Sequence, residues 1–317
     1  MTAPFRHELP LDAPLYVAGH RGLVGSAVWR HLVDRGHSAL VGRTSSELDL
    51  RDRSAVDTFF DEERPEYVVL AAAKVGGIVA NSTYPADFLS DNIRIQVNVL
   101  DAAARTGVRR LLFLGSSCIY PKLADQPIRE SSLLTGPLEE TNDAYAIAKI
   151  AGVLHVQALR RQHGASFVSA MPTNLYGSND NFDPETSHVL PALVRKFAEA
   201  KESGTSSVEL WGTGTPRREF LWADDLARAC VTVLEGYDDP APINIGVGED
   251  LTIEELARLI ASVVGFDGRL TFDTSRPDGT PRKLLDVSRI TALGWKPEVP
   301  LRQGIETIYR WFLDNRS

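Results

Sequence analysis

A glycine-rich segment directly after a short apolar run is the feature that most constrains how this chain folds. Residues 15–18 read Leu-Tyr-Val-Ala, and residues 19–25 follow with the spacing G-x-x-G-x-x-G. Helical spacing over 23–35, ended by Gly36, indicates that the glycines lead from a buried strand into a helix. Such a turn lets the backbone approach a ligand closely, and the free amides of the helix N-terminus bind anions such as a pyrophosphate. The segment predicts a dinucleotide site; a glycine turn needed only for packing is the alternative.

Strand-like and helical segments alternate through the first half of the chain. Further strands are expected at 38–41, 67–71, 110–114 and 166–171, and helices at 54–63, 84–105 and 144–162. Because parallel strands joined by helices cross over with one hand, this order predicts an α/β fold, a Rossmann-type doubly wound parallel sheet over 15–172.

The pattern loosens after Pro172. We expect loops over 174–184 and 273–281, a turn at 212–216, a strand at 208–211, and helices at 189–203, 223–235, 253–264 and 301–315. These predict a smaller mixed α/β C-terminal substrate domain over 173–317, some of whose segments return to the sheet. Residues 1–14 form an N-terminal extension.

Charge and cysteine usage exclude several classes of protein. The chain has 317 residues, with 34 Lys and Arg against 42 Asp and Glu, so its formal charge is −8. This balance argues against nucleic-acid binding but leaves room for a basic pocket that takes an anionic small molecule. Two cysteines make no disulfide framework, and no histidine or cysteine has metal-ligand spacing, so we expect no metal. The apolar stretch 68–80 is broken by Lys74, and no signal peptide is evident. We therefore expect a cytoplasmic protein with no membrane partner.

The end of the second strand indicates which dinucleotide binds. An NAD site usually has an acidic residue there for the ribose 2′-hydroxyl, whereas this strand ends Val-Gly-Arg-Thr over 41–44. Arg43, together with Arg21 in the glycine segment, suits a 2′-phosphate, because guanidinium groups pair with phosphate oxygens in a fork. The prediction is NADP(H); an ordinary solvated arginine is the alternative for Arg43.

A second motif carries acid–base chemistry. Tyr145 and Lys149 are four residues apart on a predicted helix and therefore share a face. A nearby ammonium favours the phenolate, and Lys149 can also bond the nicotinamide ribose. Ser116 follows the fourth strand, at the carboxyl edge where ligands bind, and can polarise a carbonyl beside Tyr145.

Together these segments resemble the short-chain dehydrogenase/reductase superfamily in its extended, nucleotide-sugar branch. More narrowly, the sequence is similar to the epimerase-reductases that act on GDP-4-keto-6-deoxymannose. The resemblance spans nearly the whole chain after residue 14 and is carried by residues 19–25, 71–78, 114–121, 145–149, 171–177 and 277–283.

The resemblance implies a role for each matching residue. Ser116, Tyr145 and Lys149 would form the reductase triad, and Cys118 and His188 the acid–base pair of an epimerisation at C3 and C5. The implied cofactor-binding residues are Gly19, His20, Arg21, Gly22, Leu23, Val24, Gly25, Arg43, Leu114, Gly115, Ser116, Ser117, Tyr145, Lys149, Pro172, Thr173, Asn174, Leu175 and His188. Those for the GDP-sugar are Lys196, Trp211, Arg218 and Asp278. The family can carry a further basic residue where this chain has Ser45, which weakens the NADPH preference without removing it.

Several of these residues have simpler explanations from the sequence alone. A free cysteine such as Cys118 is most often a small buried hydrophobe, and His188 fits a surface or capping histidine. Trp211 suits stacking on a base and Arg218 a diphosphate, but an ordinary turn with a core tryptophan is equally plausible. Asp278 is a common turn former. Cys230, within a predicted helix, is interpreted as core.

The leading hypothesis is the two-step conversion of GDP-4-keto-6-deoxy-D-mannose to GDP-L-fucose, by C3/C5 epimerisation and NADPH-dependent reduction at C4. The alternatives are another nucleotide-sugar epimerase or dehydratase with retained NAD, and a non-catalytic NADP-sensing protein. Dehydratases of this branch usually place Asp-Glu after the active-site Ser/Thr, where this chain has Ser117 and Cys118. The resemblance also implies a homodimer built on the helices predicted at 84–105 and 144–162.

Overall fold

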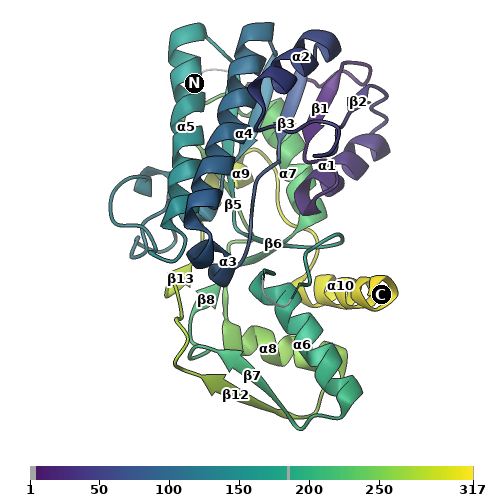
Figure 1. Cartoon of the computed structure of the whole chain (residues 1–317), viewed down its shortest axis with the longest axis vertical. Coiled ribbons are helices and arrows are strands. Elements are labelled where there is room, and N and C mark those ends of the chain that lie inside the picture. The colour runs from purple at the N-terminus through teal and green to yellow at the C-terminus, as the bar shows by residue number, and fades with distance from the viewer. Residues whose placement is uncertain (1–4, 184–185, 317) are drawn as a thin grey trace.

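The computed structural model describes residues 5–183 and 186–316 (Figure 1). Residues 1–4 of the predicted extension, Pro184 at the end of the predicted loop, and Ser317 lie outside the described residues.

A six-stranded parallel sheet organises the first half of the chain. Its order is β10-β5-β4-β3-β1-β2. The strands are β1 (Leu15–Ala18), β2 (Leu40–Val41), β3 (Tyr67–Leu70), β4 (Arg110–Leu114), β5 (Phe167–Pro172) and β10 (Ile243–Ile245). Every pairing is parallel. The predicted doubly wound α/β fold is confirmed.

Helices cover both faces of this sheet. α1 (Leu23–Asp34) packs against α7 (Ala223–Gly236) on one face, while α2 (Arg53–Glu63), α4 (Pro85–Thr106) and α5 (Asp143–His163) cover the other. Side chains of a strand alternate between the two faces. In β1, Leu15 and Val17 join the core beneath α1 and α7, and Tyr16 and Ala18 join the core beneath α2, α4 and α5. Because both faces are buried, the strands read as continuous apolar runs.

The C-terminal part has its own core. Helices α6 (Val189–Ser203), α8 (Ile253–Val264) and α10 (Leu301–Asn315) pack with the parallel pair β7 (Ser207–Trp211) and β12 (Arg269–Asp273). A small sheet of order β11-β8-β13 joins β8 (Arg217–Arg218), β11 (Leu251–Thr252) and β13 (Arg282–Lys283). β6 (Asn174–Tyr176) pairs with β9 (Phe220–Trp222), and the remaining short helices are α3 (Ile78–Thr83), α9 (Ser288–Ala292) and two 3₁₀ turns, Ser117–Ile119 and Glu130–Ser132. Figure 1 shows this part below the sheet along the long axis, with β6 and α3 near the junction.

The structure corrects some local predictions. The loop predicted over 174–184 begins as strand β6, and the strand predicted at 38–41 is only β2. None of the strands β8 to β13 was predicted from the sequence. All but β12 have two or three residues, so their pairing depends on neighbours distant in the chain rather than on a local pattern. Over the described residues, no helix is both long and apolar enough for a bilayer crossing.

Candidate functional site

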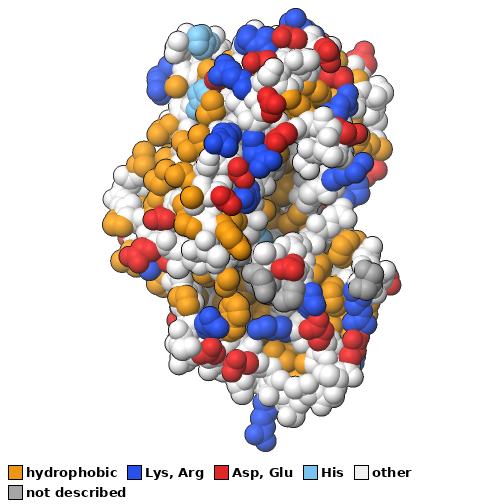
Figure 2. All heavy atoms as spheres, viewed as in Figure 1, with side chains coloured by type: hydrophobic (Ala, Val, Ile, Leu, Met, Phe, Trp, Pro, Cys, Tyr) orange, Lys and Arg blue, Asp and Glu red, His pale blue; other side chains and the backbone are white. Residues whose placement is uncertain are grey.

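The site residues converge where the parallel strands share their carboxyl edge. The glycine segment leaves β1, the Ser116–Cys118 turn leaves β4, and residues 172–175 continue from β5. Ligands of doubly wound sheets bind at this edge. Figure 2 shows the surface hollowed between the sheet-bearing part and the C-terminal part.

The glycine segment forms a cradle that side chains would fill. Gly19 has a φ of +84°, and a Cβ there would lie 2.9 Å from the Ala72 nitrogen. At Gly25 a Cβ would lie 2.5 Å from the Gly19 carbonyl carbon, so the helix and the turn can be in contact only if residue 25 is glycine. Gly22 differs: a Cβ there would meet only the Gly19 oxygen, at 3.5 Å. Gly22 is the N-cap of α1 and supplies no side-chain cap, which leaves the first-turn amides without a side-chain acceptor. The geometry fits the pyrophosphate of a dinucleotide.

The two arginines predicted for a 2′-phosphate lie in one neighbourhood. The charges of Arg21 and Arg43 both act on His20 and on Glu47. Burial first and then the Arg21 charge lower the pKa of His20, so this ring is neutral at pH 7. Arg43 forms an ion pair with Glu63. A 2′-phosphate would therefore compete with a carboxylate for Arg43, whereas Arg21 is exposed.

Tyr145 and Lys149 lie on α5 as predicted, but the ammonium does not set the phenol pKa. Lys149 Nζ donates to the Leu114 carbonyl at 2.9 Å and lies over the Tyr145 ring, 5.8 Å from its centroid. Burial raises the pKa of Tyr145, negative charge on Cys118 raises it further, and hydrogen bonding to Ser116 opposes both. The prediction that this pKa is lowered was wrong, because burial raises it. The phenol is instead protonated at neutral pH, as a proton donor must be. Burial lowers the pKa of Lys149 to about 8.

Cys118 is surrounded by donors and cations. Its sulfur accepts from the Asn142 amide and the Lys283 ammonium, both at 3.5 Å, and its own amide donates to Ser116 Oγ at 3.2 Å. Burial raises the pKa of this thiol, but Lys283, hydrogen bonding to Ser116 and the Arg218 charge outweigh burial, so the net shift is downward. A lowered pKa increases the fraction of Cys118 that is thiolate at a given pH.

His188 is the N-cap residue of α6 and is accessible at the cleft. Surrounding protein atoms and then the Lys283 charge lower its pKa, so the ring is neutral at pH 7. To act as the acid of the pair that the resemblance implies, His188 would first have to gain a proton.

The remaining cofactor positions are mostly held by backbone contacts. The Gly115 amide donates to Ala170 at 2.9 Å, next to buried Leu114 and Ser117. The Thr173 amide donates to the Ile245 carbonyl at 3.0 Å, and Asn174 Nδ2 to the Glu219 carbonyl at 2.8 Å. Pro172 ends β5, and Leu175 pairs with Leu221 of β9. These contacts fix the backbone of β5 and β6 beside the cleft.

All four predicted substrate residues lie in the C-terminal part, and Trp211 is the exposed one among them. Trp211 is 47% exposed, with Lys196 Nζ 5.1 Å and Arg276 Cζ 5.0 Å from its ring centroid. An exposed indole close to two cations suits an anionic nucleotide. Arg218 is half-buried, and its guanidinium donates to the Arg217 and Asp278 carbonyls at 2.9 Å and 3.4 Å.

Asp278 is engaged in the neighbouring turn. Its carboxylate accepts from the Thr213 amide at 2.8 Å and from the Thr213 hydroxyl at 2.9 Å, against Gly212 at φ +80°. Binding of a ribose by Asp278 stays a prediction.

Sequence reasoning missed Asn142, Lys283 and Arg276. Each contacts a predicted site residue only through the tertiary fold; Lys283 is 165 residues from Cys118. Lys283 does fall within the segment 277–283 that carries the resemblance, which is the one available signal. Cys230 is fully buried, as predicted, and burial raises its pKa to about 12.

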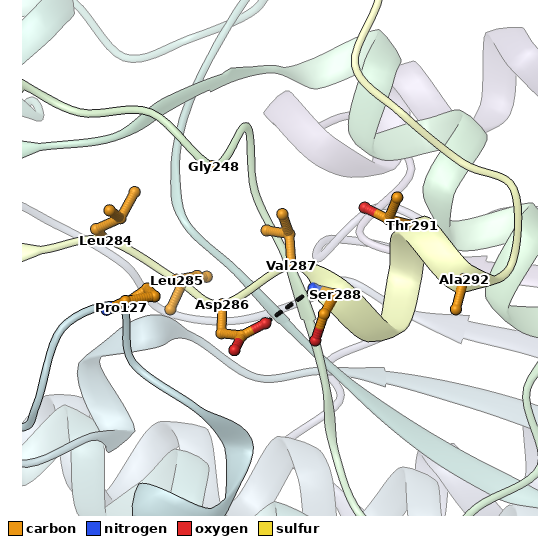
Figure 3. Close-up of a pocket in the computed structure, with 9 residues that line it drawn as sticks. All are labelled: Pro127, Gly248, Leu284, Leu285, Asp286, Val287, Ser288, Thr291 and Ala292. Carbon is orange, nitrogen blue, oxygen red and sulfur yellow. Dashed lines mark hydrogen bonds between the residues drawn. The ribbon is translucent and has the colours of Figure 1, made fainter.

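The predicted site residues lie away from one cavity of the structure. A cavity of 620 Å³ is lined by Pro127, Gly248, Leu284, Leu285, Asp286, Val287, Ser288, Thr291 and Ala292 (Figure 3). None of the predicted site residues lines it. Among residues 5–183 and 186–316, no cluster of His, Cys, Asp and Glu could hold a metal ion.

Comparison with known proteins agrees with this geometry. The model of the NAD dependent epimerase/dehydratase family matches residues 15–246. A "Probable GDP-L-fucose synthase 1" from Oryza sativa subsp. japonica is 60% identical, over 95% of this chain and 92% of its own length. The "GDP-L-fucose synthase" of Escherichia coli K12 is 55% identical, over 96% and 97%. The crystal structure of a GDP-L-fucose synthetase from Naegleria fowleri bound to NADP has a TM-score of 0.89 and 33% identity, and covers 99% of this chain and 96% of that one.

The chain belongs to the NAD-dependent epimerase/dehydratase family, the extended branch of the short-chain dehydrogenases/reductases. Within that family, its high-identity, full-length similarity is to the GDP-L-fucose synthases.

Proposed function

We propose that this protein converts GDP-4-keto-6-deoxy-D-mannose to GDP-L-fucose, first epimerising C3 and C5 and then reducing C4. The observation that supports this most is that Ser116 interacts with both Cys118 and Tyr145, so one cleft combines a low-pKa thiol with a protonated phenol. The relatives at 55–60% identity support the same substrate.

NADP(H) is the cofactor we propose, held by the glycine segment, Lys149 and the two arginines. When bound, it supplies hydride to C4 of the sugar. Tyr145 then donates its phenolic proton to the oxygen at C4, with Ser116 bonding that oxygen.

The epimerisation needs proton transfer on both faces of the carbons next to the C4 ketone. Cys118, as a thiolate, removes the proton at C3 or C5, the electron pair moves into the enolate, and His188, in its protonated imidazolium form, donates a proton from the opposite face. A thiolate with an imidazolium carries the same number of protons as a thiol with a neutral imidazole, so the step needs one proton shared by the two residues. Because the pKa values of both groups are lowered, the pair loses this proton as pH rises.

Lys196, Trp211, Arg218 and Asp278 are proposed to bind the GDP moiety, with Arg276 beside Trp211. We also propose a homodimer through α4 and α5. These helices pack side by side, and α5 exposes Ile147 and Leu154, 46% and 42% accessible and seven residues apart on one helix face. Sedimentation velocity tests the dimer. A cytoplasmic location remains a prediction.

The test is incubation with GDP-4-keto-6-deoxymannose and NADPH, followed by product identification. Tyr145→Phe should abolish reduction while deuterium exchange at C3 and C5 persists in D₂O. Cys118→Ala should lose that exchange.

Normal exchange in Cys118→Ala would contradict the two roles. Turnover without net NADPH consumption would favour the alternative, an epimerase with retained NAD.

A further inference from the structure

Lys283 is a buried ammonium without a carboxylate partner. Its residue is 9% exposed, on β13, and its Nζ donates to Cys118 Sγ at 3.5 Å. Across the described residues, 5–183 and 186–316, none of the ion pairs includes Lys283. A buried cation is costly unless an anion or strong acceptors compensate it.

The charged and hydrogen-bonding groups around Cys118 favour negative charge on its sulfur. Lys283 and Arg218 are cations, and the Ser116 hydroxyl and the Asn142 amide are donors. Tyr145 is a further titratable neighbour, and its phenol is neutral at pH 7. Glu139 and Asp278 act on Arg218.

We propose that Lys283 is a positioning residue that forms an ion pair with Cys118, and so holds this sulfur as a thiolate before substrate binds. The ion pair follows from the contacts alone. Its use, preparing the base for the epimerisation, rests on the proposed function.

The same ammonium acts on the acid–base partner. Its charge also lowers the pKa of His188. When Cys118 takes a proton from the sugar carbon, the sulfur becomes a neutral thiol and the electron pair passes into the enolate. The positive charge of Lys283 is then uncompensated at the sulfur, which favours loss of the proton from the thiol and so restores the thiolate after the epimerisation. One cation thereby acts on the protonation of both residues.

The experiment measures how fast iodoacetamide alkylates Cys118 as a function of pH, without substrate. Only the thiolate reacts, so the rate reports the thiolate fraction directly. Cys118→Ser gives the background, which should be small because Cys230 is fully buried. The wild type should have its half-maximal rate below the ordinary cysteine value of about 8.5.

Three lysine variants separate charge from structure. Lys283→Met keeps the length but removes the charge, and its alkylation rate at pH 7 should fall about tenfold or more, with the profile moved to higher pH. Lys283→Arg keeps the charge and should stay near the wild type. Lys296→Met, at an exposed position, removes one positive charge elsewhere and should leave the profile unchanged.

Superimposable profiles for the wild type and Lys283→Met would overturn the ion pair. If Lys283→Met does not fold, a wild-type midpoint at or above the ordinary value overturns it independently.

Deuterium exchange into the GDP-sugar then separates the two proposals. A shifted profile in Lys283→Met with no exchange by the wild type supports the ion pair and overturns the proposed function. Exchange by the wild type with no effect of Lys283→Met on alkylation leaves the function standing and overturns the inference.

Discussion

Substitution by alanine should show that Gly25 is needed for packing, whereas Gly22 is needed for binding of the cofactor. A Cβ at Gly25 would lie 2.5 Å from the Gly19 carbonyl carbon and 2.9 Å from His20 Cα, both backbone atoms that no rotamer change can move. Contacts between carbon atoms are comfortable at about 3.5–4.0 Å, so helix α1 and the turn must separate by roughly 1 Å. Overpacking of this kind costs about 1–3 kcal/mol.

Gly22 gives the opposite expectation. Its φ of −77° suits alanine, and the nearest atom to an added Cβ, the Gly19 oxygen, is at 3.5 Å, an ordinary contact. Gly22→Ala should therefore fold normally and even gain up to about 0.4–1 kcal/mol from a more restricted unfolded chain. The added methyl, however, occupies the space through which a pyrophosphate approaches the first-turn amides, so the Kd for NADPH should rise at least about tenfold.

The assay is thermal unfolding of both variants without ligand, together with NADPH titration by fluorescence. For a chain of 317 residues, a loss of about 2 kcal/mol should lower the Tm of Gly25→Ala by roughly 3 °C, with NADPH binding lost too. Wild-type NADPH affinity in Gly22→Ala would refute the assignment of this turn as the cradle. A wild-type Tm in Gly25→Ala would refute the steric argument.

Three further predictions concern charge. Arg43→Ala should reduce the preference for NADPH over NADH about tenfold or more. Glu63→Gln removes the ion pair that engages Arg43 and should increase this preference. Unchanged ratios of kcat/KM for the two cofactors would exclude Arg43 from the 2′-phosphate site. Burial raises the pKa of Asp180 to about 7. The native state therefore keeps a proton that the unfolded chain releases near pH 4. Because the native state binds more protons in this range, the free energy of unfolding falls as pH rises from about 4 to 7. Asp180→Asn should therefore be more stable than the wild type at pH 8 but equal at pH 4, as Tm values at both pH values will show. Burial lowers the pKa of Lys149 to about 8, so above that pH the unfolded chain binds more protons than the native state. The wild type should therefore gain stability relative to Lys149→Met between pH 8 and 10. A Tm difference between the two proteins that does not change with pH would contradict this.

Segments whose structure is decided by local pattern were predictable from the sequence. Helices α6, α8 and α10 begin and end where their spacing and flanking residues indicate, and β4 matches its apolar run. The glycine segment was predictable because its φ and contact requirements admit only glycine at Gly19 and Gly25.

Short strands and cross-chain contacts were not predictable in this way. β8 and β13 have two residues each, too few for an alternating pattern to stand out. The raised pKa of Tyr145 and the pairing of Arg43 with Glu63 depend on burial and on neighbours brought together only by the fold. Sequence motifs thus identified the candidate reacting groups but not their protonation states.

The surroundings of the sulfur depend on the C-terminal part of the chain. In the parallel pair β8 and β13, Arg217 stands opposite Arg282 and Arg218 opposite Lys283. Arg217 and Arg282 both donate to Asp250, at 2.8 Å and 2.5 Å. Because side chains alternate along a strand, the next residue of each strand is directed to the other side, where both cations act on Cys118.

Asp250 therefore aligns the two strands that bring positive charge to a sulfur on the sheet-bearing part. The proposed reduction at C4 uses Ser116, Tyr145 and Lys149, which all come from segments of the sheet-bearing part. The proposed base, in contrast, depends on a strand pair from the other part. It follows that loosening β8 and β13 should impair the proposed epimerisation before the proposed reduction.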